Sequence, residues 1–359
     1  MNPTRSTLLR LTLTAALGTT LLAGQAHATS DLSELIAAAQ EEGRVDSVGM
    51  PDTWANWKDT WADLKENYGL EHMDTDMSSA EEIAKFKAEG ENATADIGDV
   101  GISFGPIAVA EDVTQPYKPT TWEEIPDWAK DEDGHWMLGY TGTIALMSNK
   151  QLVAEGERPR TFADLTEGDY TVAVGAVGQA AQANSAVLAA AYANGGDESN
   201  LTPGLELFAE LARQGRLSLA NPSIANLEKG EVEVALLWDF NALNYRDQID
   251  REAFDVVIPS DASVTSGYAT IINKHAPHPN AAKLAREYIL SDEGQFNLAE
   301  GYARPIRAQH LTLPEDIAAK LLPNAQYANA RPVEDFDAWE KSARQLPRQW
   351  QSQVLIHQQ

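Results

Sequence analysis

The sequence contains no cysteine. This absence excludes disulfide bonds, thiolate metal sites and cysteine nucleophiles. It also excludes a lipid anchor attached through a thiol near the N terminus, because the stretch Leu-Leu-Ala-Gly at 21–24 is not followed by one. A chain of 359 residues can bury enough apolar surface without cross-links, and its length predicts two domains or lobes.

Long apolar runs are also scarce. One run, 11–22, follows Arg5 and Arg10 and precedes Ala26-His27-Ala28. These are the three parts of a signal peptide, here cleaved after Ala28, so we expect a periplasmic protein with residues 1–28 removed. The run is too short for a permanent membrane helix, and no later stretch is long enough, so we expect no stable membrane insertion. An uncleaved N-terminal anchor is the alternative.

Basic residues are few. The chain has 27 lysines and arginines against 54 acidic residues, a net charge of −27. Without the two arginines of residues 1–28, the balance is 25 against 54 and the net charge −29. Such a surface excludes nucleic acid as a partner. The acids are spread along the chain, which favours a heavily solvated surface suited to high salt. Attraction of cationic ligands is the alternative, although screening limits it to about 8–10 Å.

What is present is a regular alternation of helix and strand patterns. Such alternation is typical of α/β proteins whose sheets are covered by helices. A helix from about 280 to 289 would have Asn280 as its N-cap, and Ser291 would cap the next one. The other expected helices are 31–40, 54–67, 79–89, 180–194, 202–215, 223–229 and 334–353 with an interruption at Pro347; the expected strands are 44–48, 70–75, 95–100, 170–174, 231–238, 254–258 and 268–273.

Candidate ligand-binding residues lie on loops that follow these strands, because ligands of open α/β sheets bind at the carboxyl ends of strands. Helix starts offer N–H groups to an anion, carboxylates suit an amine or sugar hydroxyls, and tryptophans form an apolar or cation–π wall. Ser78 and Ser79 also have the spacing of capping boxes with Glu81 and Glu82. The loop candidates are Asp52, Trp54, Ser78, Ser79, Asp99, Gly178, Gln179, Trp238, Asp239 and Asn241.

The order of several short motifs resembles the extracellular solute-binding proteins of ABC importers, in the branch that includes ferric-ion, hexose-phosphate and 2-aminoethylphosphonate binders. Each motif is weak alone, but together they span about 270 residues. They are 79–89 followed by 95–97 (ADI), 116–122 (PYKPTTW), 133–136 (DGHW), 148–150 (SNK), 161–165 (TFADL), 230–235 (GEVEVA), 279–284 (PNAAKL), 291–295 (SDEGQ) and 301–307 (GYARPIR).

This resemblance implies a periplasmic-binding-protein fold of type II, with two α/β lobes, hinge strands and a ligand cleft between them. Lobe 1 would comprise residues 29–140 and 263–310, and lobe 2 residues 141–262 and 311–359. The closed form would deliver a small-molecule ligand to an ABC permease in the inner membrane, with no cofactor and no chemistry on the solute, and a monomer is expected. Hinge residues that face the cleft would be Tyr140, Thr141, Thr143 and Tyr268.

Within this family the sequence favours a small polar organic solute. A ligand with both an amine and a phosphorus oxyanion would use the helix starts, the carboxylates and the aromatic wall. A polyamine, the second choice, would use only the carboxylates and tryptophans. Ferric ion is disfavoured because no Tyr-Tyr pair occurs.

Two further motifs have other interpretations. Ser103 lies in Gly-Ile-Ser-Phe-Gly, the G-x-S-x-G pattern of a hydrolase nucleophile, although Pro106 follows closely. His275 and His278 form an H-x-x-H pair with Pro277 between them. We expect a flexible loop at Ser103 rather than a catalytic residue, and no metal site at the histidines.

Overall fold

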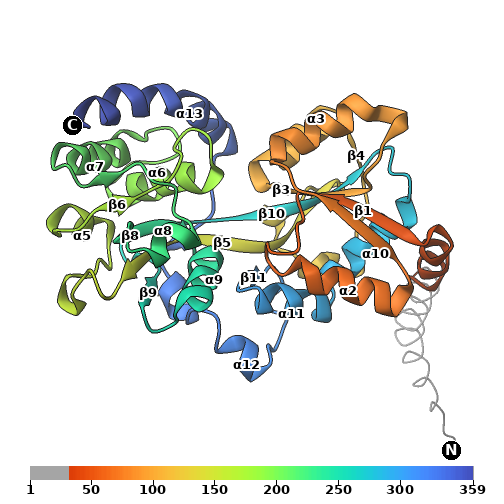
Figure 1. Ribbon diagram of the computed structural model, residues 1–359. Coiled ribbons are helices and arrows are strands. Elements are labelled where there is room, and N and C mark those ends of the chain that lie inside the picture. The colour runs from red at the N-terminus through yellow and green to blue at the C-terminus, as the bar shows by residue number, and fades with distance from the viewer. Residues whose placement is uncertain (1–31, 359) are drawn as a thin grey trace, which may run out of the picture.

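The computed structural model describes residues 32–358 as two lobes side by side, joined by two long strands (Figure 1). The expected signal peptide and its cleavage after Ala28 lie outside the described residues. From residue 32 to residue 358, no helix is long and apolar enough to cross a membrane.

One mixed sheet runs through both lobes. Its strand order is β2-β1-β3-β10-β5-β8-β6-β7, with β4, β9, β11 and β12 at its margins. β5 (Trp136–Asn149) and β10 (Ser263–Asn273) pair antiparallel in the middle of this order. The remaining bounds are β1 Arg44–Val48, β2 Glu71–Thr75, β3 Ile97–Gly101, β4 Thr114–Gln115, β6 Val172–Ala173, β7 Leu217–Ser218, β8 Val234–Trp238, β9 Phe254–Val257, β11 Arg304–Pro305 and β12 Ala330–Arg331.

The partners of β5 change along its length. Up to Thr143 the strand pairs with β10, and from Ile144 onward it pairs with β8, then also with β9. β10 in turn pairs with β3 from Tyr268 onward. These two strands therefore belong to the sheets of both lobes, and a rotation between the lobes must pass through them.

Lobe 1 contains the parallel strands β1, β2 and β3, with helices on both sides (Figure 1). The structure corrects two expected helix starts here. The helix expected from Trp54 begins at Trp57, because Asn56 has the left-handed backbone conformation. The N-cap of the helix at 279–289 is His278, whereas Asn280 lies inside the helix and donates to Glu42. The lobe's helices are residues 32–42, α2 Trp57–Tyr68, α3 Ser79–Glu89, α4 Gly105–Ala110, α10 Pro279–Ile289 and α11 Asp292–Glu300.

Lobe 2 surrounds the alanine-rich helix α6 (Ala181–Ala193), which is buried along most of its length. Its small side chains allow close packing of α7 (Thr202–Arg213) at Gly204, where a Cβ atom would lie 2.4 Å from the Val187 carbonyl oxygen. Thr202 is the first residue of α7. The other helices of this lobe are α5 Phe162–Glu167, α8 Ile224–Glu228 and α9 Asp239–Ile249, whereas the short helix α12 (Glu315–Ala318) contacts α11 of lobe 1.

The last long helix, α13 (Phe336–Gln349), lies on top of lobe 2 beside α6 (Figure 1). The interruption expected at Pro347 does not occur: Pro347 lies within the last turn of the helix, and a π-helical segment, Trp350–Val354, continues the chain. Trp350 packs edge-on against Phe208 of α7, with ring centroids 5.5 Å apart. This contact fixes the C-terminal segment to lobe 2.

Candidate ligand-binding cleft

A cavity of about 420 Å³ lies between the lobes. Lobe 1 contributes residues 101–107, at the end of β3 and the start of α4, and lobe 2 contributes 178–185 and Trp238. The hinge strand β10 supplies 266–268, and residues 333–344 of α13 and the segment before it form the remaining wall. The cavity therefore lies at the carboxyl ends of strands, as the α/β rule requires.

Four of the residues expected to bind ligand line this cavity: Gly178, Gln179, Trp238 and Tyr268. Trp238 ends β8 and is almost fully buried, and its indole Nε1 has no hydrogen-bond partner among the described residues. Burial raises the pKa of the Tyr268 hydroxyl, and the nearby Trp238 N–H partly offsets this rise. The Trp238 N–H and the Tyr268 hydroxyl nevertheless do not meet hydrogen-bond geometry. The Trp238 Nε1 atom itself has almost no exposed surface, so Trp238 lines the cavity through other atoms of its ring.

The start of α6 also opens into the cavity. Ala180 provides no side-chain cap. Gly178 N–H donates to Asn184 Oδ1 (2.7 Å), whereas the first-turn N–H groups of residues 181–183 have no acceptor within the described part of the chain. Unpaired N–H groups at a helix start attract an anion.

The partly buried Trp54 and the buried Tyr140 and Asp99 form one chain of hydrogen bonds behind the cavity. Trp54 Nε1 donates to the Tyr140 hydroxyl (2.6 Å), which donates to Asp99 Oδ2 (2.7 Å). The Trp54 ring also packs edge-on against Phe240 and Tyr268. These three expected ligand residues therefore support the floor of the cleft and do not line the cavity.

Asp99 lies beside a second buried acid. Glu82 Oε2 accepts from the Asp99 N–H (3.1 Å), and the Glu82 carboxylate packs against Gly49 and Gly98, where a Cβ atom would lie within 2.5 Å of its oxygens. Burial raises the pKa of Asp99 to about 8, and burial together with the charge of Asp99 raises the pKa of Glu82 well above its usual range. Burial thus favours the protonated forms of both acids.

Asp239 is likewise engaged by protein groups. Its Oδ1 accepts from the N–H groups of Thr143 and Phe240, and its Oδ2 accepts from the Tyr327 hydroxyl (2.6 Å). Burial raises its pKa. Thr143 also shares a hydrogen bond with Thr265 across the hinge strands (2.9 Å). Thr141 on β5 is buried, Asn241 lies in α9, and neither lines the cavity.

The serines at the start of α3 have different roles. Ser78 forms the expected capping box with Glu81, whose Oε2 accepts from the Ser78 N–H (2.8 Å). The box expected between Ser79 and Glu82 is wrong, because Ser79 Oγ instead accepts from the Gly101 N–H (3.0 Å). Ser79 thus fixes the end of β3, next to the cavity, without lining it.

Asp52 lines a second, more polar cavity of about 270 Å³ between the start of α2, α9 and α11. Asp59 and Glu300 contribute further carboxylates there, and Asn244 and Gln248 contribute amides.

Ser103 lines the interlobe cavity in a short 3₁₀ turn, 102–104, between β3 and α4. The strand, turn and helix of a nucleophile elbow are therefore present. No histidine is among the described residues that line the cavity, so the cavity lacks the histidine base that accompanies such a serine.

Sequence reasoning missed the wall formed by α13. Phe336, Trp339 and Ala343 face the cavity from this helix, and Glu340 and Arg344 form an ion pair at its rim. The amphipathic pattern of 334–353 indicated a helix with a buried face. It carried no information on which part of that face closes the cleft.

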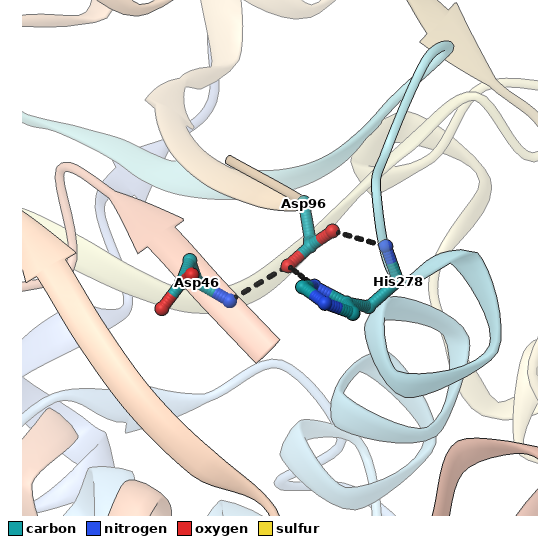
Figure 2. Close-up of side chains that lie close together, drawn as sticks. All are labelled: Asp46, Asp96 and His278. Carbon is teal, nitrogen blue, oxygen red and sulfur yellow. Dashed lines mark hydrogen bonds and ion pairs between the residues drawn. The ribbon is translucent and has the colours of Figure 1, made fainter. Parts of the chain in front are cut away.

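A cluster of possible metal ligands lies away from the cleft, at the amino ends of the lobe 1 strands. Ligand atoms of Asp46, Asp96 and His278 lie within 4.8 Å of one another. Figure 2 shows how they interact: Asp96 Oδ2 accepts from the Asp46 main-chain N–H (2.8 Å) and is 3.0 Å from His278 Nδ1, and Asp96 Oδ1 accepts from the His278 N–H (2.7 Å). The Asp46 carboxylate accepts from Arg44 and from the Met73 N–H. The contacts of Asp96 join β1, the start of β3 and the start of α10.

The chain matches known proteins over most of its length. The family of bacterial extracellular solute-binding proteins matches residues 92–341. The sulfate-binding protein of Escherichia coli (strain K12) is 25% identical over 129 residues, which are 33% of this chain and 35% of that protein's length.

Two solved structures show the same fold. The periplasmic binding protein AfuA from Actinobacillus pleuropneumoniae, with fructose-6-phosphate bound, superposes with a TM-score of 0.68 at 15% identity, over 87% of this chain and 98% of that one. The spermidine/putrescine ABC transporter substrate-binding protein PotD from Streptococcus pneumoniae gives 0.66 at 17% identity, over 86% and 98%. The expected type II binding-protein fold with two lobes is thus confirmed, and the chain belongs to the family of bacterial extracellular solute-binding proteins.

Proposed function

We propose that the protein captures a small organic solute with an anionic group in the interlobe cavity and delivers it to an ABC permease in the inner membrane. It acts in the periplasm as a monomer, without a cofactor, and leaves the solute chemically unchanged. Lobe 1 comprises residues 29–140 and 263–310 in this proposal, and lobe 2 comprises 141–262 and 311–359.

The observation that carries the proposal is that both lobes and the hinge contribute walls to one cavity. A rotation through β5 and β10 changes the distance between residues 101–107 and 178–185, so opening admits a solute and closing encloses it. A ligand that contacts both walls favours the closed form, which is the form a permease recognises.

An anionic group is favoured by the start of α6. Its three unpaired N–H groups stabilise a negative charge by about 0.3–1 kcal/mol when exposed and up to about 2 kcal/mol when partly buried. The amine-binding half of the sequence-based hypothesis has less support, because Asp99 and Asp239 are hydrogen-bonded to protein groups and Glu340 is paired with Arg344.

A polyamine is the second candidate, and the more polar cavity at Asp52 favours it. Asp52, Asp59 and Glu300 place three carboxylates around that space, although Glu300 is paired with Lys320. Putrescine binding that is lost in Asp52→Asn and retained in Gln179→Ala would replace the proposed site with this one.

The test begins with purified residues 29–359, unfolded in denaturant to release any bound solute, which mass spectrometry then identifies. The refolded protein is melted with phosphate esters, phosphonates, carboxylates, polyamines, sugars and ferric citrate. A ligand at 100 times its Kd adds about 2.7 kcal/mol, which is roughly 5–10 °C for lobes of this size. Gln179→Ala should reduce the shift. No released solute together with no shift from any compound would contradict the proposal.

A further inference from the structure

The walls of the interlobe cavity are largely apolar. Phe104 and Ile107 face it from lobe 1, Trp238 from lobe 2, and Phe336 and Trp339 from α13. Of these, Phe104, Ile107 and Phe336 are only partly buried by the protein, so they keep apolar surface that a ligand can cover. A sugar or a polyamine has little apolar surface to offer such walls, whereas a ring or branched hydrocarbon does.

The charges around the cavity point to a ligand of low net charge. Arg344 is the one basic residue among the described residues that line it, and it is paired with Glu340 on the next turn of α13. The two side chains add no net charge at the rim, so a phosphate dianion inside the cavity meets no surplus of positive charge. One negative charge, in contrast, matches the unpaired N–H groups at residues 181–183.

The polar part of the site is the start of α6. A carboxylate has two oxygens, so it can accept from more than one of the unpaired N–H groups of residues 181–183. The Trp238 Nε1 atom has almost no exposed surface, so the indole ring contributes apolar surface to the cavity wall.

We propose that the solute is a monocarboxylate with an apolar, aromatic-sized body. The body packs between Trp238 and the face of α13 that carries Phe336, and the carboxylate lies at the start of α6. This inference rests on the proposed function, since it names the class of solute that the same cavity takes.

The experiment is isothermal titration of residues 29–359 with a matched set of probes. Phenylacetate carries both an aromatic ring and a carboxylate. Acetate carries the carboxylate alone, and benzyl alcohol carries the aromatic ring without a charge. We expect phenylacetate to bind at least about tenfold more tightly than either, because burial of an aromatic ring adds the equivalent of one or more factors of ten. Intrinsic fluorescence gives a second readout, since Trp238 and Trp339 line the cavity.

Two variants test the placement. Phe336→Ala should weaken phenylacetate binding about tenfold, whereas Lys341→Ala, exposed on the same helix, should leave it unchanged. Because Phe336 also packs against the core, a second pair is needed. Ala343→Asp places a carboxylate in the wall and should weaken phenylacetate by more than tenfold, whereas Gln345→Asp, exposed on the same helix and outside the cavity lining, should leave binding unchanged.

Two outcomes would overturn the inference. If glycerol 3-phosphate or putrescine binds and phenylacetate does not, the solute class is wrong while capture by the cavity stands. If phenylacetate binds but no more tightly than acetate, the apolar wall has no part in recognition. The solute released from the purified protein tests the proposed function separately, because its detection does not depend on these probes.

Discussion

Tyr140, on the hinge strand β5, donates its hydroxyl hydrogen to the buried carboxyl group of Asp99 on β3 (2.7 Å). The same hydroxyl accepts from Trp54 (2.6 Å), so one phenol joins the hinge, the middle of β3 and the loop after β1. The other oxygen of Asp99, Oδ1, has no hydrogen-bond partner among the described residues. This relationship gives the stability of the protein a defined dependence on pH.

We predict that Asp99 lowers stability as the pH rises. Burial raises its pKa to about 8, whereas an unfolded chain loses this proton near pH 4. The folded state therefore binds more protons than the unfolded state between these values, and the free energy of unfolding falls as the pH increases through this window. Asp99→Asn should remove this part of the slope. Urea unfolding at pH 5, 6.5 and 8 measures it, and the variant should gain most at pH 8.

The matched control for this series is Asp169→Asn, at an exposed site. Its unfolding free energies should run parallel to those of the wild type. A constant offset between Asp99→Asn and the wild type from pH 5 to 8 would mean that Asp99 is ionised in the folded protein throughout this range.

Gly178 couples the start of α6 to the last turn of α13. Its φ is +87°, and a Cβ atom there would lie 2.8 Å from Pro347 Cγ and 3.0 Å from its Cα. Gly195 has a similar φ of +81° but no atom within 4 Å of the added Cβ. Gly195→Ala should lose about 1–2 kcal/mol of stability from backbone strain, and Gly178→Ala about 1–3 kcal/mol more from the steric clash.

Chemical denaturation of both variants measures that difference, and titration with a bound solute measures its consequence. Gly178→Ala should also weaken solute binding, because Gly178 lines the cavity and α13 forms its wall. Equal losses of stability in the two variants would show that α13 shifts freely to accommodate the methyl group.

Substitutions in the Asp46–Asp96–His278 cluster can distinguish a structural role from metal binding. Asp96 is fully buried and accepts from two main-chain N–H groups and from the His278 ring. Asp96→Ala should therefore lose about 2–4 kcal/mol, because buried donors are left unpaired. Asp46→Ala should lose less, since its carboxylate pairs with the partly exposed Arg44.

Thermal melts with added ZnCl₂ or EDTA separate the two roles. We expect neither to change the melting temperature of the wild type. A rise with zinc that disappears in both variants would establish a metal site and contradict the structural one.

The sequence by itself determined the elements whose signals are local. α3 occupies the expected 79–89, because Ser78 and Glu81 close its first turn and Gly90 follows its last residue. β1 occupies the expected 44–48, and Ser291 caps α11 as expected. Caps, breakers and hydrophobic periodicity act over a few residues, so they can be read without knowing what lies opposite.

Only the tertiary structure decided which side chains meet. Arg286, an ordinary charged position within an amphipathic pattern, is fully buried and donates to main-chain oxygens of Tyr117, Gly134 and Thr270. The wall at Phe336 comes from the far end of the chain. Packing also decided which candidate acids remain available to a ligand, because Asp99 and Asp239 each accept a hydrogen bond from a tyrosine hydroxyl group. Such pairings depend on strand register and on how the helices cross the sheet. Register and crossing are set by how the whole chain buries its apolar surface, so no local pattern reveals them.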